Sequence, residues 1–262
     1  MSTRKPLAHH RFLLTNDDGL EAPGLALLEE IVRELSDDVW VIAPDSERSG
    51  ASHSISLHHP IRVRRVGERR CAIYGTPTDC VLMAYYELMQ DTRPTFVLSG
   101  INNGANLGED VSYSGTCAAA MEGTLLGLRS IALSVVRALS GTARWDVARE
   151  MLPELLTKLV LNDDWPAGSF LNINFPDALP NEITGVRVTE QGQRPPGAFS
   201  IDARIDARNV PYYWVKISYP EGEKGPDTDL HAVQDNAVSI TPIQLDFTNH
   251  AWRRRLETLI ET

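Results

Sequence analysis

Cysteine and lysine are both scarce in this chain of 262 residues. Its three cysteines are Cys71, Cys80 and Cys117. Because their number is odd and no pair has CxxC spacing, the sequence argues against a disulfide scaffold and against a cysteine zinc site. So few cysteines fit a reducing compartment, and we expect the protein to be cytoplasmic. No lysine lies between Lys5 and Lys158.

The chain also lacks an excess of positive charge and long apolar runs. Lys and Arg total 25 against 35 Asp and Glu, which gives a formal net charge of −10. A chain this acidic is poorly suited to hold a nucleic-acid polymer or an anionic membrane through bulk charge. No apolar run approaches the roughly 20 residues of a membrane span, so we expect no membrane partner.

Several well-known catalytic motifs are missing as well. The sequence contains no GxxxxGK[ST], no GxGxxG, no GxSxG and no HExxH, and its seven histidines show no zinc-ligand spacing. These absences argue against a P-loop nucleotide hydrolase, a dinucleotide-binding turn, a serine hydrolase of the α/β type and a zinc protease.

Apolar runs that predict strands alternate with amphipathic segments that predict helices. This alternation is typical of parallel strands that are covered on both faces, so we predict an α/β fold with a doubly wound, mostly parallel, Rossmann-like sheet. Residues 11–176 form the predicted catalytic core. Residues 177–262 are richer in Pro and Gly, and they predict a β-rich antiparallel extension and a C-terminal helix. The predicted strands are 12–15, 39–43, 61–66, 71–74, 96–99, 131–135, 170–175 (the last strand of the core sheet), 212–218 and 238–243, and the predicted helices are 23–35, 76–89, 116–128, 143–161 and 250–261.

Two acidic residues, Asp17 and Asp18, directly follow the first predicted strand. Ligands of open α/β sheets bind at the carboxyl ends of strands, and two carboxylates there repel each other unless a cation joins them. An ordinary Asn-Asp-Asp-Gly turn is the alternative. After the second strand, Ser49 has a hydroxyl that suits a cation and Arg48 suits a phosphate, although a solvated loop is again the alternative.

Residues 100–108 combine three glycines with three asparagines, among them Asn102 and Asn106. Such a loop suits close backbone approach to a ligand, and the alternative is an irregular surface loop. Ser114, Gly115 and Thr116 open the following helix, where free N–H groups and hydroxyls suit an anion. An ordinary N-cap explains these three residues equally well.

Taken together, these loops place Asp, Ser and Asn oxygens at one sheet edge, a donor set that suits Mg²⁺ or Mn²⁺. A helix N-terminus beside such a cation suits a phosphate. We therefore predict a metal-assisted phosphohydrolase in which metal-activated water attacks phosphorus. A Mg²⁺-binding, receiver-like signalling domain without turnover is the alternative, but the lysine that receivers use after their fifth strand has no counterpart here.

The motifs resemble those of the SurE family, the survival-protein 5′/3′-nucleotidases. They occur in family order and with family-like spacing. They are TNDDG at 15–19, APG at 22–24, APD at 43–45, RSGAS at 48–52, GTPTDC at 75–80, SGIN at 99–102, NLG at 106–108, YSGT at 113–116 and AAAMEG at 118–123.

The resemblance implies a 5′-nucleotidase that removes phosphate from nucleoside 5′-monophosphates, and in some members from 3′-monophosphates and short polyphosphate. It implies one divalent cation per subunit, Mg²⁺ or Mn²⁺, and a homodimer or homotetramer that exchanges its C-terminal segments. The implied metal ligands are Asp17, Asp18, Ser49 and Asn102, and the implied phosphate-binding residues are Asn106, Ser114, Gly115 and Thr116.

Three further residues are noted against this family pattern. Glu109 stands where the family usually has Asp, which bears on the geometry around the ligands. Asp246 and His250 lie in the C-terminal segment, and we predict His250 as an acid–base helper beside the catalytic Asp17 and Asp18. A histidine at the start of a helix is the alternative.

Overall fold

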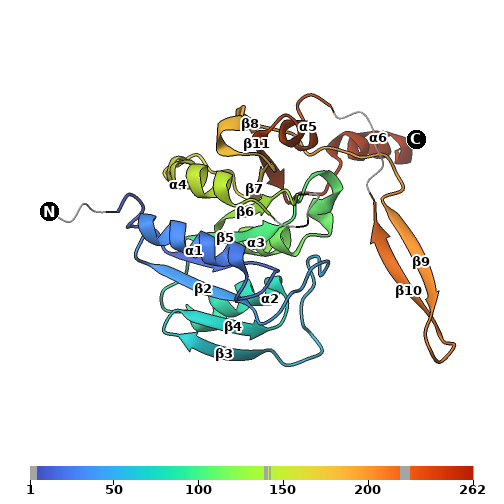
Figure 1. The fold of residues 1–262 in the computed structure, drawn as a ribbon. Coiled ribbons are helices and arrows are strands. Elements are labelled where there is room, and N and C mark those ends of the chain that lie inside the picture. The colour runs from blue at the N-terminus through green and yellow to red at the C-terminus, as the bar shows by residue number, and fades with distance from the viewer. Residues whose placement is uncertain (1–4, 139–140, 142, 219–224, 262) are drawn as a thin grey trace.

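A mixed β-sheet with helices on both faces forms the centre of the computed structural model (Figure 1), which describes residues 5–138, 141, 143–218 and 225–261. Within these residues the sheet has nine strands in the order β3-β4-β2-β1-β5-β6-β7-β11-β8. The strands are β1 (Phe12–Thr15), β2 (Val39–Pro44), β3 (Arg62–Gly67), β4 (Arg70–Tyr74), β5 (Phe96–Asn103), β6 (Arg129–Val135), β7 (Ser169–Phe175), β8 (Gly185–Val188) and β11 (Ala237–Gln244).

The strands from β4 to β7 in the sheet order run parallel, as the alternating sequence pattern predicts. β3 pairs antiparallel with β4, and the two correspond to the strands predicted at 61–66 and 71–74. The long helices are α1 (Pro23–Leu35), α2 (Pro77–Met83, which continues as the π-helix Ala84–Leu88), α3 (Gly115–Leu125) and α4 (Asp146–Val160).

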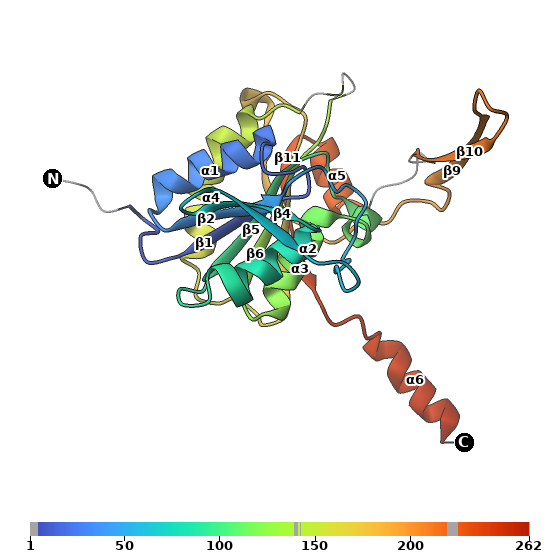
Figure 2. The same cartoon turned by 90° about the horizontal axis from the view of Figure 1, so that it is seen from below.

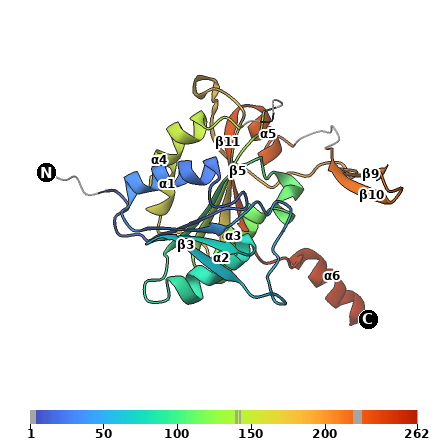
Figure 3. The ribbon, with the colours of Figure 1, turned by 60° about the horizontal axis from the view of Figure 1, so that its bottom comes forward.

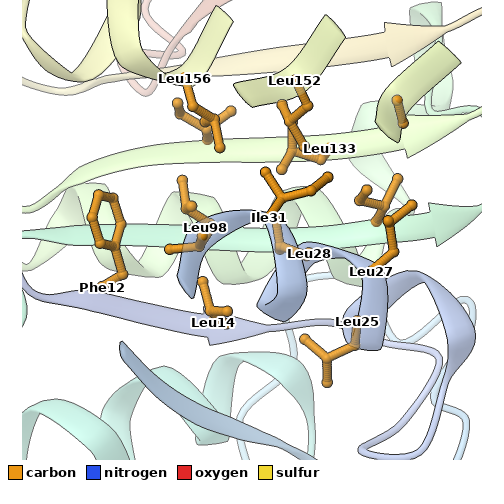
Figure 4. Packing of buried hydrophobic residues seen from close by; sticks show 14 of the residues in the cluster. Phe12, Leu14, Leu25, Leu27, Leu28, Ile31, Leu98, Leu133, Leu152 and Leu156 are labelled. Carbon is orange, nitrogen blue, oxygen red and sulfur yellow. The ribbon is translucent and has the colours of Figure 1, made fainter. Parts of the chain in front are cut away.

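The helices cover the two faces of the sheet in pairs (Figure 3). α1 and α4 pack on one face, where Leu28, Leu152 and Leu156 meet Leu14 of β1 in a fully buried cluster (Figure 4). α2 and α3 cover the other face, where Leu13 of β1 faces them. Adjacent residues of one strand are thus buried on opposite faces, which is why these strands read as continuous apolar runs.

β5 corrects one sequence prediction. We expected the strand to end at Ser99 and a long loop to run to Gly115, but β5 continues to Asn103, and the 3₁₀ helix Gly108–Ser112 occupies much of the remainder. Gly100 makes the continuation possible, because a Cβ there would lie 2.3 Å from the carbonyl oxygen of Leu133 in β6. This glycine therefore serves close strand pairing rather than approach to a ligand.

β7 is the last strand of the parallel run, but it is not the edge of the sheet as predicted. β11 pairs antiparallel with it, and β8 pairs parallel with β11. The short helices Pro180–Glu182 and α5 (Asp229–Gln234) belong to this part of the chain. The predicted antiparallel extension is confirmed, while the division at residue 176 stays a prediction.

Two C-terminal elements extend away from the body (Figures 1 and 2). One is the hairpin of β9 (Phe199–Ile205) and β10 (Pro211–Ile217), and the other is the predicted terminal helix, α6 (His250–Ile260). Large apolar side chains of both are exposed, among them Trp214 at 57% and Ile260 at 80%. Among the described residues, no helix is both long and apolar enough to cross a membrane.

Candidate active site and metal centre

The turn after β1 positions the acidic pair. Asn16 closes the turn, since its side-chain amide donates to the Gly19 carbonyl (2.9 Å) and its Oδ1 accepts from the Gly19 N–H (3.2 Å). Gly19 has φ +105°, a value that L side chains rarely adopt. Asp17 is only 4% exposed, and Asp18 is half-buried beside it. The Asn-Asp-Asp-Gly turn is therefore confirmed, and it holds two carboxylates at the sheet edge, while the metal site there stays a prediction.

Burial is the largest influence on the pKa values of Asp17 and Asp18. It raises the pKa of Asp17 to about 6; the Thr116 hydroxyl, which donates to Oδ1, opposes this rise, and the negative charge of Asp18 adds to it. Burial also raises the pKa of Asp18. The Asn103 N–H, which donates to Oδ2 at 3.1 Å, opposes this rise. The positive charge of Arg137 also lowers the pKa of Asp18. A cation between these oxygens would offset the cost of burying them as charges.

The N-terminus of α3 lies directly against Asp17. A Cβ on Gly115 would lie 2.7 Å from the Asp17 Cβ, so only glycine allows this approach. Ser114 is the N-cap and accepts the N–H of Cys117 at 3.0 Å, as the simpler reading expected. The N–H groups of Gly115 and Thr116 are in the first turn of α3, where no intrahelical acceptor is available. The helix start is thus capped by Ser114, and anion binding by its first N–H groups stays a prediction.

The segment after β2 brings Ser49 toward the acidic pair. The Arg48 N–H donates to the Asp17 carbonyl at 2.8 Å, which ties the two loops together. The Ser49 hydroxyl donates to Glu47 at 2.9 Å, so its oxygen lone pairs remain available to a cation. Arg48 itself turns to Asp45, 3.3 Å away, and this pairing argues against its predicted contact with phosphate.

Three side chains beyond Ser49 fasten the same loop to α2, α3 and the 3₁₀ helix. Ser52 donates to the Ser112 carbonyl at 2.8 Å. His53 lies 2.9 Å from the buried Glu122 of α3. Ser56 donates through its hydroxyl (2.6 Å) and its N–H (3.0 Å) to Asp79, which also caps α2. The position of Ser49 therefore depends on contacts remote from the carboxylates.

Asn102, near the end of β5, and Asn106, beyond it, have different tasks. Asn102 donates its amide to the Gly104 carbonyl at 2.7 Å, which leaves its oxygen for a cation. Asn106 is buried, and its amide donates to Ser134 at 2.8 Å while its N–H donates to Asn174 at 2.8 Å. The bond to Ser134 uses one of the two N–H donors of the Asn106 amide, and the predicted phosphate contact stays a prediction.

A cavity of about 500 Å³ opens beside Asp18. Asp45, Glu47 and Asn103 are among its lining residues, and Arg137 is the basic side chain among them. Arg137 donates to the Asn103 carbonyl through Nη2 (2.7 Å) and Nε (3.3 Å). The cavity adjoins the carboxylates and is large enough for a substrate beyond its reacting group.

The predicted helper His250 and the family departure Glu109 lie outside this cluster. His250 is 58% exposed and pairs with Asp246 at 2.9 Å, and α6, which carries it, extends from the body (Figure 2). Within one chain His250 is therefore not brought to Asp17 and Asp18, and its role as an acid–base helper stays a prediction. Glu109 pairs with Arg194 (3.1 Å), so it faces the C-terminal segment.

The donor set fits a hard divalent cation. Within the described chain no group of three or more His, Cys, Asp or Glu residues could hold a metal, so a cation here would take neutral oxygens besides the two carboxylates. Asn102, near the end of β5, and Ser49, in the segment after β2, offer such oxygens. Oxygen-only coordination with few charges is typical of Mg²⁺ and Mn²⁺.

Sequence reasoning overlooked three residues of this region. Arg137 follows the end of β6, and the strand-end rule that located Asp17 would have found it if applied there. Glu122 is a carboxylate inside an otherwise apolar helix, which is a readable signal. Asp79 lies in the GTPTDC motif, but its contact with Ser56 across the fold has no sequence signature.

The fold and the site together define a doubly wound α/β protein with an oxygen-rich cluster and a cavity at the carboxyl edge of its sheet. The family model described as "Survival protein SurE" matches residues 12–197. The chain therefore belongs to the SurE family, which confirms the resemblance noted in its motifs.

Relatives and a solved structure agree with this assignment. The chain is 47% identical to a protein of Parvibaculum lavamentivorans named 5′-nucleotidase SurE, over 96% of this chain and 91% of that one. It is 50% identical to the protein of that name from Methylobacterium radiotolerans, over 91% and 94%. The crystal structure of the SurE protein from Aquifex aeolicus is similar, with a TM-score of 0.80 and 37% identity over 95% of this chain and 99% of that chain.

Proposed function

We propose that the protein is a metal-dependent 5′-nucleotidase that removes phosphate from nucleoside monophosphates. The observation that carries the proposal is the contact of the α3 N-terminus with Asp17, because a helix start suits a phosphate and Asp17 with the half-buried Asp18 suits a cation. Relatives of similar length named 5′-nucleotidase SurE support a nucleotidase phosphohydrolase. We include activity on 3′-monophosphates and on short polyphosphate in the same proposal.

Asp17, Asp18, Ser49 and Asn102 would hold one Mg²⁺ or Mn²⁺ per subunit. When bound, the cation supplies positive charge to a phosphoryl oxygen and lowers the pKa of a coordinated water. Thr116 holds the orientation of Asp17 through its hydroxyl. The Glu47 carboxylate holds the orientation of Ser49 by accepting the hydrogen bond that the Ser49 hydroxyl donates.

The helix start would bind the phosphate. The first N–H groups of α3 donate to phosphoryl oxygens, and the helix dipole favours the charge that accumulates there during transfer. Such donors are fixed before the substrate arrives, so no reorganisation is required when the charge develops.

We also infer that a second copy of the chain covers the projecting elements, giving a homodimer or homotetramer. The exposed apolar side chains of the β9–β10 hairpin and α6 support this inference, because isolated monomers seldom leave so large an apolar area in water. In such an assembly α6 could bring His250 to a neighbouring site, a role that within this proposal remains a prediction.

The proposal is tested by phosphate release from 5′- and 3′-nucleoside monophosphates after EDTA treatment, with Mn²⁺ or Mg²⁺ restored. We expect metal-restored turnover, and we expect Asp17→Asn to lose on the order of 10²-fold in kcat/KM at saturating metal. Turnover that persists in EDTA would contradict the metal dependence. A stable acid-labile phosphoprotein without turnover would instead support the receiver-like alternative.

A further inference from the structure

The proposed mechanism leaves the cavity beside Asp18 unused. Three carboxylates besides Asp18 line it, namely Glu21, Asp45 and Glu47, while Arg137 is the basic side chain in the lining. An anionic substrate in this cavity is attracted by the guanidinium of Arg137 and repelled by the carboxylates of the lining. Arg137 is therefore the residue to examine first.

Arg137 has donor capacity to spare. Its Nη2 and Nε share a single acceptor, the Asn103 carbonyl, at 2.7 and 3.3 Å. Within the described structure its Nη1 has no hydrogen-bond partner, and no carboxylate lies within ion-pair distance of it. Arg48, the other arginine near the site, is paired with Asp45 at 3.3 Å. A guanidinium has five N–H donors, so most of those of Arg137 remain available.

Asn103 fixes the spacing between Arg137 and the metal ligands. Its N–H donates to Asp18 at 3.1 Å, and its carbonyl accepts from Arg137 Nη2 at 2.7 Å. Because the N and O of one residue lie about 3.5 Å apart, at most about 9 Å separates the Asp18 oxygen from Nη2. A path of about that length leads from the Asp18 oxygen through the cation to a phosphate oxygen, by two metal–oxygen bonds of about 2.1 Å each. It continues across one phosphate edge of about 2.5 Å and along a hydrogen bond of about 2.8 Å to Nη2.

We propose that Arg137 binds a non-bridging oxygen of the substrate's phosphate group in this cavity. This assignment rests on the proposed function, since it places the phosphate on a cation at Asp18. Arg137 would stay anchored through Asn103 and turn its free N–H groups to the phosphate. A charge-assisted contact of this kind strengthens binding of both substrate and product phosphate.

The test compares wild type, Arg137→Gln and Arg137→Lys. Arg149→Gln is the matched control, because Arg149 makes a surface ion pair with Glu30. Calorimetry measures the affinity of each metal-free protein for Mn²⁺, and then the affinity of each Mn²⁺-loaded protein for inorganic phosphate. Steady-state assays with adenosine 5′-monophosphate give KM and kcat separately.

For Arg137→Gln we expect phosphate affinity to fall about tenfold or more, with a matching rise in KM, while Mn²⁺ affinity stays within twofold of wild type. Arg137→Lys should recover part of the loss, and Arg149→Gln should behave as wild type. Unchanged phosphate affinity in Arg137→Gln would overturn the assignment. So would an equal loss of Mn²⁺ affinity, because Arg137 would then act only by supporting Asn103.

Failure of this inference is distinguishable from failure of the proposed function. If wild type turns over and Arg137→Gln has normal KM and phosphate affinity, only the inference is wrong. If wild type does not turn over with any metal, the proposed function is wrong. Phosphate binding to the Mn²⁺-loaded proteins still decides the role of Arg137 in that case.

Discussion

Gly115 offers the sharpest test of the site, because one methyl group is enough to disturb it. A Cβ at this position would lie 2.7 Å from the Asp17 Cβ and 3.0 Å from its Oδ2. Carbon atoms in favourable contact are about 3.5 to 4.0 Å apart, so α3 and the turn after β1 must separate by roughly 1 Å to admit alanine. A misplacement of that size at a catalytic centre lowers the rate by about 10²-fold.

The Gly115→Ala variant is assayed for kcat/KM with a nucleoside monophosphate at saturating Mn²⁺, and its Tm is measured in parallel. We expect kcat/KM to fall about 10²-fold and overpacking to cost about 1 to 3 kcal/mol of stability. Gly67→Ala is the matched control, since its Cβ would meet nothing closer than 3.5 Å. A kcat/KM within twofold of wild type for Gly115→Ala would refute the claim that the helix start and Asp17 must touch.

Three further predictions concern the loop, the hairpin and the thiols. His53→Ala should lower kcat/KM by roughly tenfold by loosening the segment that carries the predicted serine ligand, whereas His58→Ala, in the same loop, should not; equal effects would contradict this. Trp214→Ser should lower the molecular mass found by light scattering, and an unchanged mass would mean that no second copy covers the hairpin at that residue. Burial raises the pKa of Cys117 to about 12 and that of Cys80 well above its ordinary range, so at pH 8 about one Cys117 thiol in 10⁴ or fewer is ionised. We therefore expect all three thiols to resist Ellman's reagent until guanidinium is added, and rapid labelling of the native protein would contradict their burial.

Local sequence signals were enough to predict most of the fold. Continuous apolar strands and the Pro23 start of α1 are dictated by burial and by backbone preference, so the parallel core follows from them. The end of β5 was not predictable in this way. Its extension to Asn103 depends on Leu133 lying beside Gly100, a contact between residues that the sequence alone does not bring together.

In the candidate site, too, the residues with local sequence signals could be predicted and those set by packing could not. Asp17 and Ser114 were found because strand ends and helix starts can be recognised locally. The commitment of the Asn106 amide to Ser134 could not be foreseen, because it arises from packing across β6. The pairing of Arg48 with Asp45, three residues away, was within reach of sequence reasoning but competed with an equally plausible phosphate contact.

The antiparallel pairing of β11 with β7 has a consequence for how the chain is made. β7 is synthesised well before β11, with β8, the hairpin and α5 between them in the chain. Until β11 emerges from the ribosome, β7 is a bare apolar edge that is open to pairing with other chains. The nascent protein therefore passes through an interval of aggregation risk that ends only when its eleventh strand docks.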